Sequence, residues 1–470
     1  MEVKDKKILI FGLARSGVGA ANLLSKLGAE VTVTDKKSEG DLADFITRLL
    51  PSVKLRIGGH PDEIFMNMDL IVVSPGVPLD ISLLKKAHEK GIEIIGELEL
   101  AYQIISSEFK VQASKYQGFL AVTGTNGKST TTTLLDMMLR KHGFRTVLGG
   151  NIGNALSEEI QGTLNSQLPT PDYVVAEVSS FQLESIDKFK PKGATILNIT
   201  PDHLDRYHSM GEYKDAKARI SLNQQEEDFL VLNADDPEVM KVGSERLKVK
   251  SRTPRIFYFS RKKKVEGAYY KDGVIYFNMP DVPSIFNLQS STFRIKGVHN
   301  LENAMAASAM ALLAKCSKEA VVSTLKEFPG LEHRLEFVRE LEGVSYINDS
   351  KGTNVGAVVK SLESFSKPVV LIAGGRDKEG DFSVLKPFVK NRVKTIILIG
   401  EAREKIKKIL GNLTETKFAD SLKEAVLLSK SYALKGDVVL LSPACASFDM
   451  FKDFEDRGRQ FKKIVMELGG

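Results

Sequence analysis

The sequence predicts an α/β protein with three domains, and three observations lead to this fold class. Short apolar runs, typical of buried parallel strands, alternate with segments of helical periodicity along the chain. At 470 residues the chain exceeds the length at which a single hydrophobic core stops growing. A glycine-rich segment at 123–130 lies between one such run and one such helix. We therefore expect an N-terminal Rossmann-like domain, a central phosphate-loop (P-loop) ATPase-type domain and a C-terminal Rossmann-like α/β domain.

The N-terminal domain is predicted to span residues 1–110. Residues 7–11 and 29–34 are expected to form parallel strands with a helix between them. This unit is similar to a dinucleotide-binding fingerprint with Asp35 as its acid, but Ala14 replaces the middle glycine. Close backbone approach to a pyrophosphate normally requires that glycine. We therefore expect the domain to hold the nucleotide part of a substrate, and a nicotinamide-dependent dehydrogenase is the less favoured alternative.

The domain boundaries are predicted from breaks in the alternation of strands and helices. A less regular segment at 101–118 separates the first domain from the second, so the central domain is predicted to begin at residue 111. Pro329-Gly330 interrupts the pattern again, which gives a central domain of 111–330 and a last domain of 331–470. Further strands are expected at 69–76, 92–96, 119–122, 145–153, 172–177, 194–200, 229–233, 255–259, 274–277, 344–348, 368–373, 395–400 and 437–442, and helices at 131–140 and 299–314.

The central domain contains the most informative motif, Thr123-Gly124-Thr125-Asn126-Gly127-Lys128-Ser129-Thr130. Its glycines let backbone N–H groups surround phosphate oxygens at the positive end of a helix. Lys128 would neutralise the β- and γ-phosphates of ATP, and the hydroxyl of Ser129 or Thr130 would bind Mg²⁺. The alternative is an ordinary strand-to-helix turn, but few such turns need glycine, lysine and two hydroxyls together.

Two polar residues follow strands of the same predicted sheet. Glu177 ends one strand, where a carboxylate beside a P-loop is expected to be a second ligand of Mg²⁺. The alternative is an acid that caps the next helix. His203 follows another strand with an acid on each side, and we predict a metal or substrate role for it. Spacing alone indicates that Lys217 is a solvated helix lysine.

Three polar loops follow strands of the last domain, at 349–354, 374–378 and 442–449. Because the carboxyl ends of parallel strands meet at one edge of a sheet, we expect the loops to line a binding crevice. Cys445 lies in the third loop, but no histidine follows His333 in the chain. A nucleophilic role of this cysteine is therefore not expected.

Composition and charge exclude several classes of protein. Apolar residues make up 42% of the chain and charged residues 27%, as in ordinary soluble domains. The net charge of +6 is too small to indicate nucleic-acid binding. Cys316 and Cys445 imply no disulfide framework, and no apolar run approaches the roughly 18 residues of a membrane span. We expect a cytoplasmic protein without nucleic-acid or membrane partners.

At the level of whole motifs the chain resembles the Mur ligases of peptidoglycan synthesis, and the resemblance covers essentially the whole sequence. The P-loop is shared across this superfamily, which includes folylpolyglutamate synthase. The other matching motifs are Gly149-Gly150-Asn151-Ile152-Gly153, Ser179-Ser180-Phe181-Gln182-Leu183-Glu184, Asp202-His203-Leu204-Asp205-Arg206-Tyr207, Glu332-His333-Arg334, Asn348-Asp349-Ser350-Lys351 and Ser442-Pro443-Ala444-Cys445-Ala446-Ser447.

The resemblance implies an ATP-driven amide ligase that adds D-glutamate to UDP-N-acetylmuramoyl-L-alanine. ATP would phosphorylate the alanyl carboxylate, and the amine of D-glutamate would attack the acyl phosphate. Two Mg²⁺ ions and a carbamylated Lys217 are implied as cofactors, and a monomer is expected. A ligase for meso-diaminopimelate or lysine is the nearest alternative, and a non-catalytic ATP-binding regulator is a more distant one.

Carried over position by position, the resemblance also implies site residues. The implied catalytic residues are Lys128, Glu177, His203, Lys217 and Lys351. The implied ATP contacts are Gly124, Thr125, Asn126, Gly127, Lys128, Ser129, Thr130, Asn303, Arg334 and Asp349. The UDP substrate would contact Arg15, Ser16, Asp35, Lys36, Gly76, Asn151 and His203. D-Glutamate would contact Lys351, Thr353, Lys378, Ser447 and Phe454. The metal ligands would be Ser129, Glu177, His203 and the carbamate of Lys217.

Overall fold

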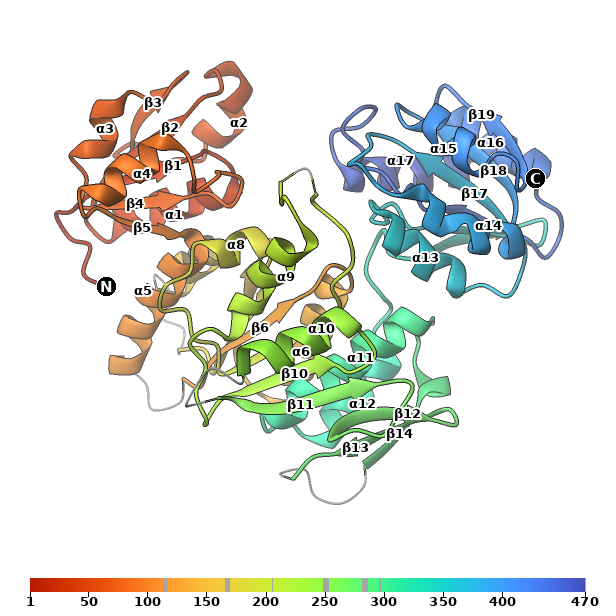
Figure 1. The fold of residues 1–470 in the computed structure, drawn as a ribbon, viewed down its shortest axis with the longest axis horizontal. Helices are drawn as coiled ribbons and strands as arrows, with labels where there is room; N and C mark the ends of the chain where they lie inside the picture. Colours follow the sequence, from red (N-terminus) through yellow and green to blue (C-terminus); the bar gives the residue numbers. More distant parts are fainter. Residues whose placement is uncertain are drawn as a thin grey trace.

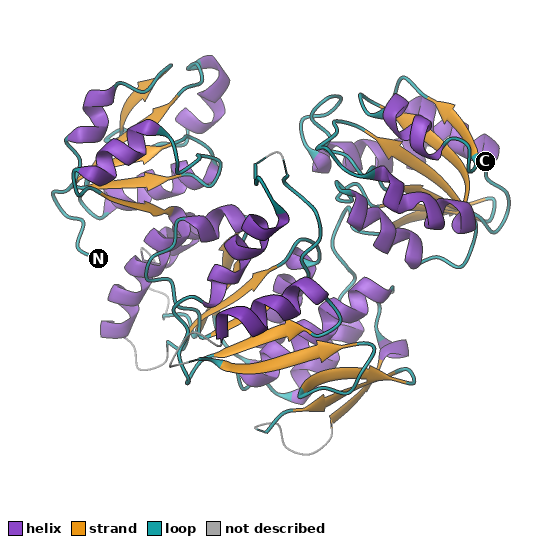
Figure 2. Cartoon of the chain, in the orientation of Figure 1, coloured by secondary structure: helices purple, strands orange, loops and turns teal. Residues whose placement is uncertain are grey.

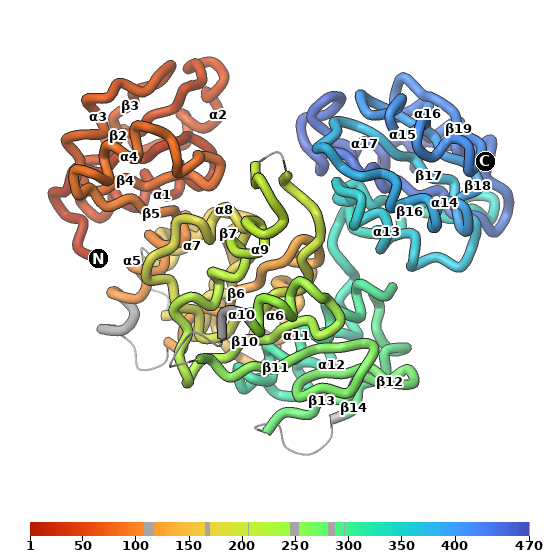
Figure 3. The backbone as a smooth tube through the Cα atoms, in the orientation of Figure 1, coloured from red at the N-terminus to blue at the C-terminus, as the bar shows by residue number. Residues whose placement is uncertain are grey.

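The computed structural model describes residues 1–112, 116–164, 170–204, 206–247, 253–280, 286–295 and 297–469. These residues form three α/β lobes, each built on its own sheet (Figure 1). The first and last lobes, red-orange and blue, are each connected to the central lobe, and the backbone can be followed through all three in Figure 3. The predicted α/β fold class is confirmed.

Five parallel strands form the N-terminal sheet, in the order β3-β2-β1-β4-β5. The strands are β1 Lys7–Phe11, β2 Glu30–Asp35, β3 Lys54–Ile57, β4 Leu70–Val73 and β5 Glu93–Gly96. The helices are α1 Arg15–Lys26, α2 Ala43–Ile46, α3 Asp62–Met66 and α4 Ser82–Glu89. The chain reverses its direction across the sheet between β1 and β4, which is the point where open α/β sheets bind ligands.

Helix α5 (Glu97–Gln112) leads from β5 into the central lobe. The prediction of a less regular segment at 101–118 is therefore wrong for residues 101–112. The helix is apolar on more than one side, because it packs between two lobes, and this hides the 3.6-residue period of an ordinary surface helix. Between residues 97 and 107, its fully buried apolar residues are Leu98, Leu100, Ala101, Ile104 and Ile105.

Nine strands form the central sheet, in the order β14-β13-β12-β11-β10-β9-β6-β8-β7. All neighbours from β7 to β12 are parallel, and the pairs β12–β13 and β13–β14 are antiparallel. The strands are β6 Gly118–Thr123, β7 Thr146–Gly150, β8 Tyr173–Glu177, β9 Gly193–Ile196, β10 Phe229–Asn233, β11 Arg255–Ser260, β12 Gly267–Lys271, β13 Val274–Asn278 and β14 Phe286–Gln289. The helices are α6 Lys128–His142, α7 Leu156–Leu164, α8 Ser180–Glu184, α9 Met210–Ala218, α10 Pro237–Leu247, α11 Val298–Leu313 and α12 Lys318–Glu327.

Six strands form the C-terminal sheet, in the order β15-β16-β20-β17-β18-β19, and only the pair β15–β16 is antiparallel among these described strands. Helices lie on both faces of the sheet (Figure 2). The strands are β15 Glu336–Leu341, β16 Val344–Asn348, β17 Val369–Gly374, β18 Val393–Ile399, β19 Glu415–Phe418 and β20 Val438–Leu441. The helices are α13 Val355–Glu363, α14 Lys386–Arg392, α15 Arg403–Leu410, α16 Leu422–Tyr432 and α17 Phe454–Glu467.

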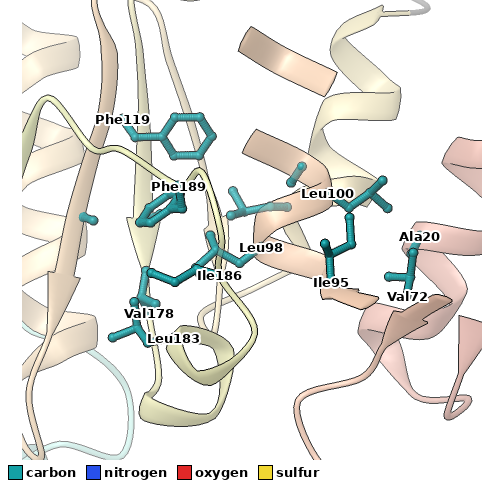
Figure 4. Close-up of a cluster of buried hydrophobic side chains, with 14 of the residues drawn as sticks. Ala20, Val72, Ile95, Leu98, Leu100, Phe119, Val178, Leu183, Ile186 and Phe189 are labelled. Atoms are coloured by element: carbon teal, nitrogen blue, oxygen red, sulfur yellow. The ribbon is translucent and has the colours of Figure 1, made fainter. Parts of the chain in front are cut away.

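The hydrophobic cores are divided unequally among the lobes. One continuous cluster joins side chains of the N-terminal sheet, such as Val72, to side chains of the central lobe, such as Phe119 and Phe189, through α5 (Figure 4). The two clusters of the C-terminal lobe, in contrast, draw all their residues from 335–468. The first two lobes therefore share a core, and the third has its own.

Two buried carboxylates at the start of α5 strengthen the connection to the central lobe. Glu97 Oε1 accepts hydrogen bonds from the backbone N and the hydroxyl of Ser157, both at 2.7 Å. Glu99 accepts from the backbone N atoms of three successive residues, Asp187, Lys188 and Phe189, at 2.9 to 3.0 Å. The first turn of α5 thus fixes both α7 and the loop before β9.

The predicted strands are found with end shifts of a few residues, while β3, β12, β14, β15 and β19 were not predicted. Four of these, all but β12, lie at the edges of their sheets. Because an edge strand faces water along one side, it needs no continuous apolar run. None of the helices that the structure describes is both long and apolar enough to cross a membrane. The boundaries after residues 110 and 330 stay predictions.

Candidate active site

The P-loop connects β6 to α6 and depends on glycine at two positions. Gly124 lies at φ 152° and Gly127 at φ 86°, where Gly127 is the N-cap of α6. A Cβ atom at Gly127 would lie 2.2 Å from Asn303 Oδ1 on α11. Glycine is therefore needed both for the backbone conformation and for the space beside Asn303.

The end of β9 holds the loop in shape. Asn198 Oδ1 accepts from the backbone N of Asn126 at 2.8 Å, and Asn198 Nδ2 donates to the carbonyl of Asn126 at 3.0 Å. The backbone N of Thr200 donates to the hydroxyl of Thr125 at 3.0 Å. These bonds satisfy backbone groups on one side of the loop, so its other N–H groups stay available for a ligand.

Two lysines, the partly buried Lys128 and the buried Lys217, donate to the same loop carbonyl. Lys128 Nζ lies 2.8 Å from the Gly124 oxygen and 2.9 Å from the Thr125 oxygen, and Lys217 Nζ lies 3.0 Å from the Gly124 oxygen. Lys217 is 1% exposed and its ammonium lies 4.5 Å from the centre of the Tyr213 ring. Burial, and then the nearby charge of Lys128, hold the pKa of Lys217 well below its usual value. The interpretation of Lys217 as a solvated helix lysine is wrong.

Glu177 ends β8 beside the loop with one oxygen unused. Its Oε1 accepts from Asn151 Nδ2 at 2.6 Å, whereas its Oε2 is buried and has no hydrogen-bond partner. The alternative that Glu177 caps the next helix is wrong, because Ser179 is the N-cap of α8 and forms a capping box with Gln182. A buried carboxylate oxygen without a donor is costly, which is typical of a position that binds a cation.

His203 lies after β9 with its backbone in the left-handed region at φ 57°. Its Nε2 is 3.8 Å from Asp202 Oδ2, and its ring lies 4.9 Å from the ring of Phe181. Burial lowers the pKa of His203, so the neutral form that binds metals is favoured near neutral pH. Over the described part of the chain, no three His, Cys, Asp or Glu side chains form a metal-binding group.

The C-terminal lobe contacts the P-loop directly. Arg334, just before β15, donates from Nη2 to the hydroxyl of Ser129 at 2.8 Å. Asn354, the N-cap of α13, lies with its Nδ2 3.4 Å from Asn126 Oδ1. Lys378 Nζ lies 3.5 Å from Asp202 Oδ1. The polar ends of the central and C-terminal sheets therefore face one another.

A cavity of about 250 Å³ lies between these two lobes. Polar side chains of β10, α11 and α13 line it, together with seven of the predicted ATP or catalytic residues, namely Asn126, Gly127, Thr130, Asn303, Arg334, Asp349 and Lys351. Burial raises the pKa of Asp349 to about 6, although Ser361 and Ser442 donate hydrogen bonds to it. Burial, and then Arg334, lower the pKa of Lys351 to about 7.

The three predicted polar loops of the C-terminal lobe converge at one edge of its sheet. Lys351 Nζ lies 3.5 Å from the centre of the Phe454 ring, and Arg376 forms a β-bridge with Ala446. The fully buried Arg457 donates to the carbonyl of Ser350 at 2.8 Å and to the carbonyl of Cys445 at 3.3 Å. Thr353 donates its backbone N to Lys351 O, and Ser447 is 2% exposed. The three loops therefore lie together at this edge of the sheet, and the binding crevice stays a prediction.

A second, larger cavity of about 730 Å³ lies between the N-terminal and central lobes. Six of the seven residues predicted to contact the UDP substrate line it, namely Arg15, Ser16, Asp35, Lys36, Gly76 and Asn151. Arg15 Nη1 donates across it to the carbonyl of Gly153 at 3.1 Å, and Asp35 Oδ2 accepts from the backbone N of Leu13 at 2.7 Å. The seventh, His203, is not among the lining residues.

Comparison with known proteins places this architecture in one family. Residues 6–96 match a model described as "Mur ligase MurD-like, N-terminal domain", residues 122–311 the "Mur ligase middle domain", and residues 333–445 the "Mur ligase, glutamate ligase domain". A protein of Geotalea daltonii named UDP-N-acetylmuramoylalanine–D-glutamate ligase is 48% identical over 472 residues, which cover 100% of this chain and 99% of that protein. The chain belongs to the Mur ligase family.

Other Mur ligases give the same result at greater distances. A protein of Caldanaerobacter subterraneus with the same name is 44% identical, with both chains fully covered. Two solved structures share the fold. MurF of Thermotoga maritima in complex with ADP has a TM-score of 0.62 and is 16% identical. The match covers 97% of this chain and 98% of that one. A pseudomurein peptide ligase type C of Methanothermus fervidus has a TM-score of 0.61 at 18% identity, covering 99% and 100%.

Several residues of this Mur ligase site were not singled out from the sequence, and Asn354 was predicted only as part of the polar loop at 349–354. Asn198 and Asn354 hold the P-loop and dock the C-terminal lobe, His60 lines the larger cavity, and the buried Arg457 joins two loops of the crevice. Asn198 could have been predicted as a site residue, because it is a polar residue that follows the end of β9. No sequence signal identified Arg457, because an arginine in a charged helix is normally exposed.

Proposed function

We propose that this chain is a ligase that joins D-glutamate to UDP-N-acetylmuramoyl-L-alanine at the expense of ATP. One observation carries the chemistry: Arg334 and Lys351 line the cavity between the central and C-terminal lobes beside the P-loop, and Glu177, whose Oε2 has no partner, interacts electrostatically with both. The choice of amino acid is supported by the full-length relatives, which are named for D-glutamate.

The reaction has two steps. The alanyl carboxylate attacks the γ-phosphorus of ATP, so a C–O–P bond forms, the bond to the β,γ-bridging oxygen breaks, and ADP leaves. The neutral amine of D-glutamate then attacks the acyl carbon, a C–N bond forms, inorganic phosphate leaves, and the amine proton passes to solvent. Lys128 and Arg334 offset the charge repulsion between a carboxylate and a polyphosphate, which is electrostatic catalysis.

The donor set fits Mg²⁺, which prefers oxygen ligands. Glu177 Oε2 has no partner at the end of β8, and Ser129 offers a hydroxyl in the first turn of α6. We assign Ser129, Glu177, His203 and a carbamylated Lys217 as ligands for two ions. When bound, Mg²⁺ would neutralise phosphate charge and hold the phosphate oxygens.

The surroundings of Lys217 support the proposed carbamate. An ammonium has three donors and no acceptor, so it repels a cation. The 1% exposure of Lys217 and the proximity of a second ammonium favour the neutral amine, which reacts with CO₂ to give a carbamate. The product presents two oxygens and a negative charge towards the P-loop.

The two cavities and the crevice divide the substrates among the lobes. The UDP substrate would occupy the 730 Å³ cavity, with Arg15 and Lys36 near its phosphates, and ATP the 250 Å³ cavity. D-Glutamate would lie near Lys351, Thr353, Lys378, Ser447 and Phe454. We place the reaction in the cytoplasm and infer a monomer.

A phosphate-release assay tests the proposed function. Purified protein with ATP and UDP-N-acetylmuramoyl-L-alanine is supplied in turn with D-glutamate, L-glutamate, L-lysine and meso-diaminopimelate. We expect release with D-glutamate alone, together with an amide product detected by mass spectrometry. Release with lysine or meso-diaminopimelate instead would establish the nearest alternative, and ATP binding without turnover would establish a regulator.

A further inference from the structure

We propose that Asp202 is a positioning residue whose carboxylate docks the C-terminal lobe onto the P-loop and orients Lys378 for amide formation. This inference rests on the proposed function in one respect, namely that Lys378 binds D-glutamate. Asp202 follows β9 in the central lobe, so any contact that it makes with Lys378 or Asn354 crosses between lobes.

The contacts of Asp202 use both carboxylate oxygens. Oδ1 lies 3.5 Å from Lys378 Nζ, and Oδ2 accepts from Asn354 Nδ2 at 3.0 Å. The same carboxylate accepts from the backbone N of His203 at 3.1 Å, which fixes its orientation within its own lobe. The carboxylate is fixed by its own lobe and has a partner in the C-terminal lobe at each oxygen. It is therefore suited to setting the position of that lobe.

Asn354 extends this contact to a helix and to the P-loop. Its Oδ1 caps α13 by accepting from the backbone N of Ala357 at 2.8 Å. Its Nδ2 donates to Asp202 and lies 3.4 Å from Asn126 Oδ1 in the loop. The carboxylate of Asp202 therefore faces the positive end of α13, which adds a favourable dipole interaction. Docking of α13 and formation of the nucleotide site are linked through this one asparagine.

The ion pair is partly removed from water. The side chain of Asp202 is 10% exposed and that of Lys378 is 26% exposed. Burial alone would raise the pKa of Asp202, but Lys378, His203 and Lys128 together lower it, so the group is an anion at neutral pH. Removal of one partner of such a pair leaves the other charge without compensation, which costs more than the loss of an exposed pair.

The kinetic test replaces Asp202 by Asn, which keeps the shape and removes the charge. We expect kcat to fall and the KM for D-glutamate to rise about tenfold, as for the loss of a charged hydrogen bond. The KM for ATP is expected to rise as well, because the proposed ATP cavity lies between the same two lobes, while the KM for the UDP substrate is expected to change by less than about twofold. A residue needed only for folding would lower the active fraction and leave all three KM values unchanged.

The distance test measures docking without any substrate. Spin labels at Glu319→Cys on α12 and Leu427→Cys on α16 report the separation of the two lobes, since both positions are exposed while Cys316 and Cys445 are buried. Asp202→Asn is expected to shift the distance distribution to longer values. Lys378→Ala is expected to do the same, and the double variant to go no further, because both remove one interaction.

A matched control is available within the C-terminal lobe. Asp437 pairs with Lys394 at 3.1 Å with exposures of 9% and 34%, close to those of Asp202 and Lys378. Asp437→Asn should leave the distance distribution unchanged. An unaltered distribution in Asp202→Asn, or additive shifts in the double variant, would overturn the positioning role. Because this measurement uses no D-glutamate, its failure is separate from failure of the proposed substrate.

Discussion

Four basic side chains, the buried Lys217 and three that are partly buried, lie around the P-loop of this Mur ligase. Lys128 and Lys217 donate to one carbonyl, and Arg334 and Lys351 face the same junction from the C-terminal lobe. Such a concentration of positive charge is costly in the absence of anions and favourable when phosphates and carboxylates bind. Two of these residues, Lys217 and Lys351, and the neighbouring Glu177 therefore give tests at the scale of single side chains.

Lys217→Ala is expected to be nearly inactive, because the carbamate oxygens are lost. A short carboxylic acid such as acetate, placed in the vacated space, should restore part of the activity, while Lys217→Arg should stay inactive because arginine keeps its charge and forms no carbamate. The measurement is phosphate release with and without acetate, and acetate on the wild-type protein is the control. Near-normal activity of Lys217→Arg would contradict the carbamate.

Glu177→Gln keeps the size of the side chain and removes its charge. Because Oε2 of Glu177 is the unpartnered oxygen beside the loop, half-maximal activity should require a much higher Mg²⁺ concentration. The readout is the Mg²⁺ dependence of the rate, with Glu404→Gln, at an exposed position of α15, as control. A superimposable titration would remove Glu177 from the metal ligands.

The lowered pKa of Lys351 predicts that the stability of the protein depends on pH. The pKa of this lysine is lowered to about 7 in the folded protein, so between about pH 7 and the usual lysine value the unfolded chain binds more protons than the folded one. Stability should therefore rise with pH across this window. Calorimetric melting temperatures of wild type and Lys351→Met at pH 6.5 to 9.5 test this, and the rise should be smaller in Lys351→Met. Equal slopes would show that other buried groups, such as Lys217, cause it.

Among the secondary-structure elements, those that build the site were the easiest to predict. Three strands, β6, β8 and β9, are buried on both faces, so each is an apolar run in the sequence that ends in polar residues. The P-loop, Glu177 and His203 could therefore be selected as site candidates from the sequence. α5 was missed because burial between two lobes removes its amphipathic period, and edge strands such as β3 lack an apolar run. The burial of Lys217 is a tertiary effect that spacing along α9 did not reveal.

Gly127→Ala tests the junction of β6, the P-loop and α6. The new methyl group would lie 2.2 Å from Asn303 Oδ1. In addition, the positive φ at this position costs roughly 1–2 kcal/mol for a non-glycine residue. We expect ATP binding, measured by calorimetry, to weaken at least tenfold while the melting temperature falls only slightly. Gly162→Ala on α7, where a Cβ meets nothing within 4 Å, is the control. Unchanged ATP affinity would contradict a rigid loop.

For the whole molecule, the division of the cores predicts how fragments behave. The clusters of the C-terminal lobe lie within residues 335–468, whereas one cluster spans the first two lobes. A fragment of 331–470 should fold alone with cooperative unfolding and dispersed amide resonances. A fragment of 116–330 should aggregate or remain loosely packed, because its surface against α5 is uncovered. A well-folded 116–330 fragment would show that the shared core is dispensable.

The asymmetry of these junctions has a consequence for recombination between relatives. An exchange of the C-terminal lobe crosses a polar interface that a few residues maintain, so a crossover near Gly330 needs to preserve only pairs such as Asp202 with Lys378. An exchange of the N-terminal lobe must include α5 together with the central-lobe residues that pack against it. These include the segment whose backbone N–H groups donate to Glu99. Working chimaeras should therefore be common at the second junction and rare at the first.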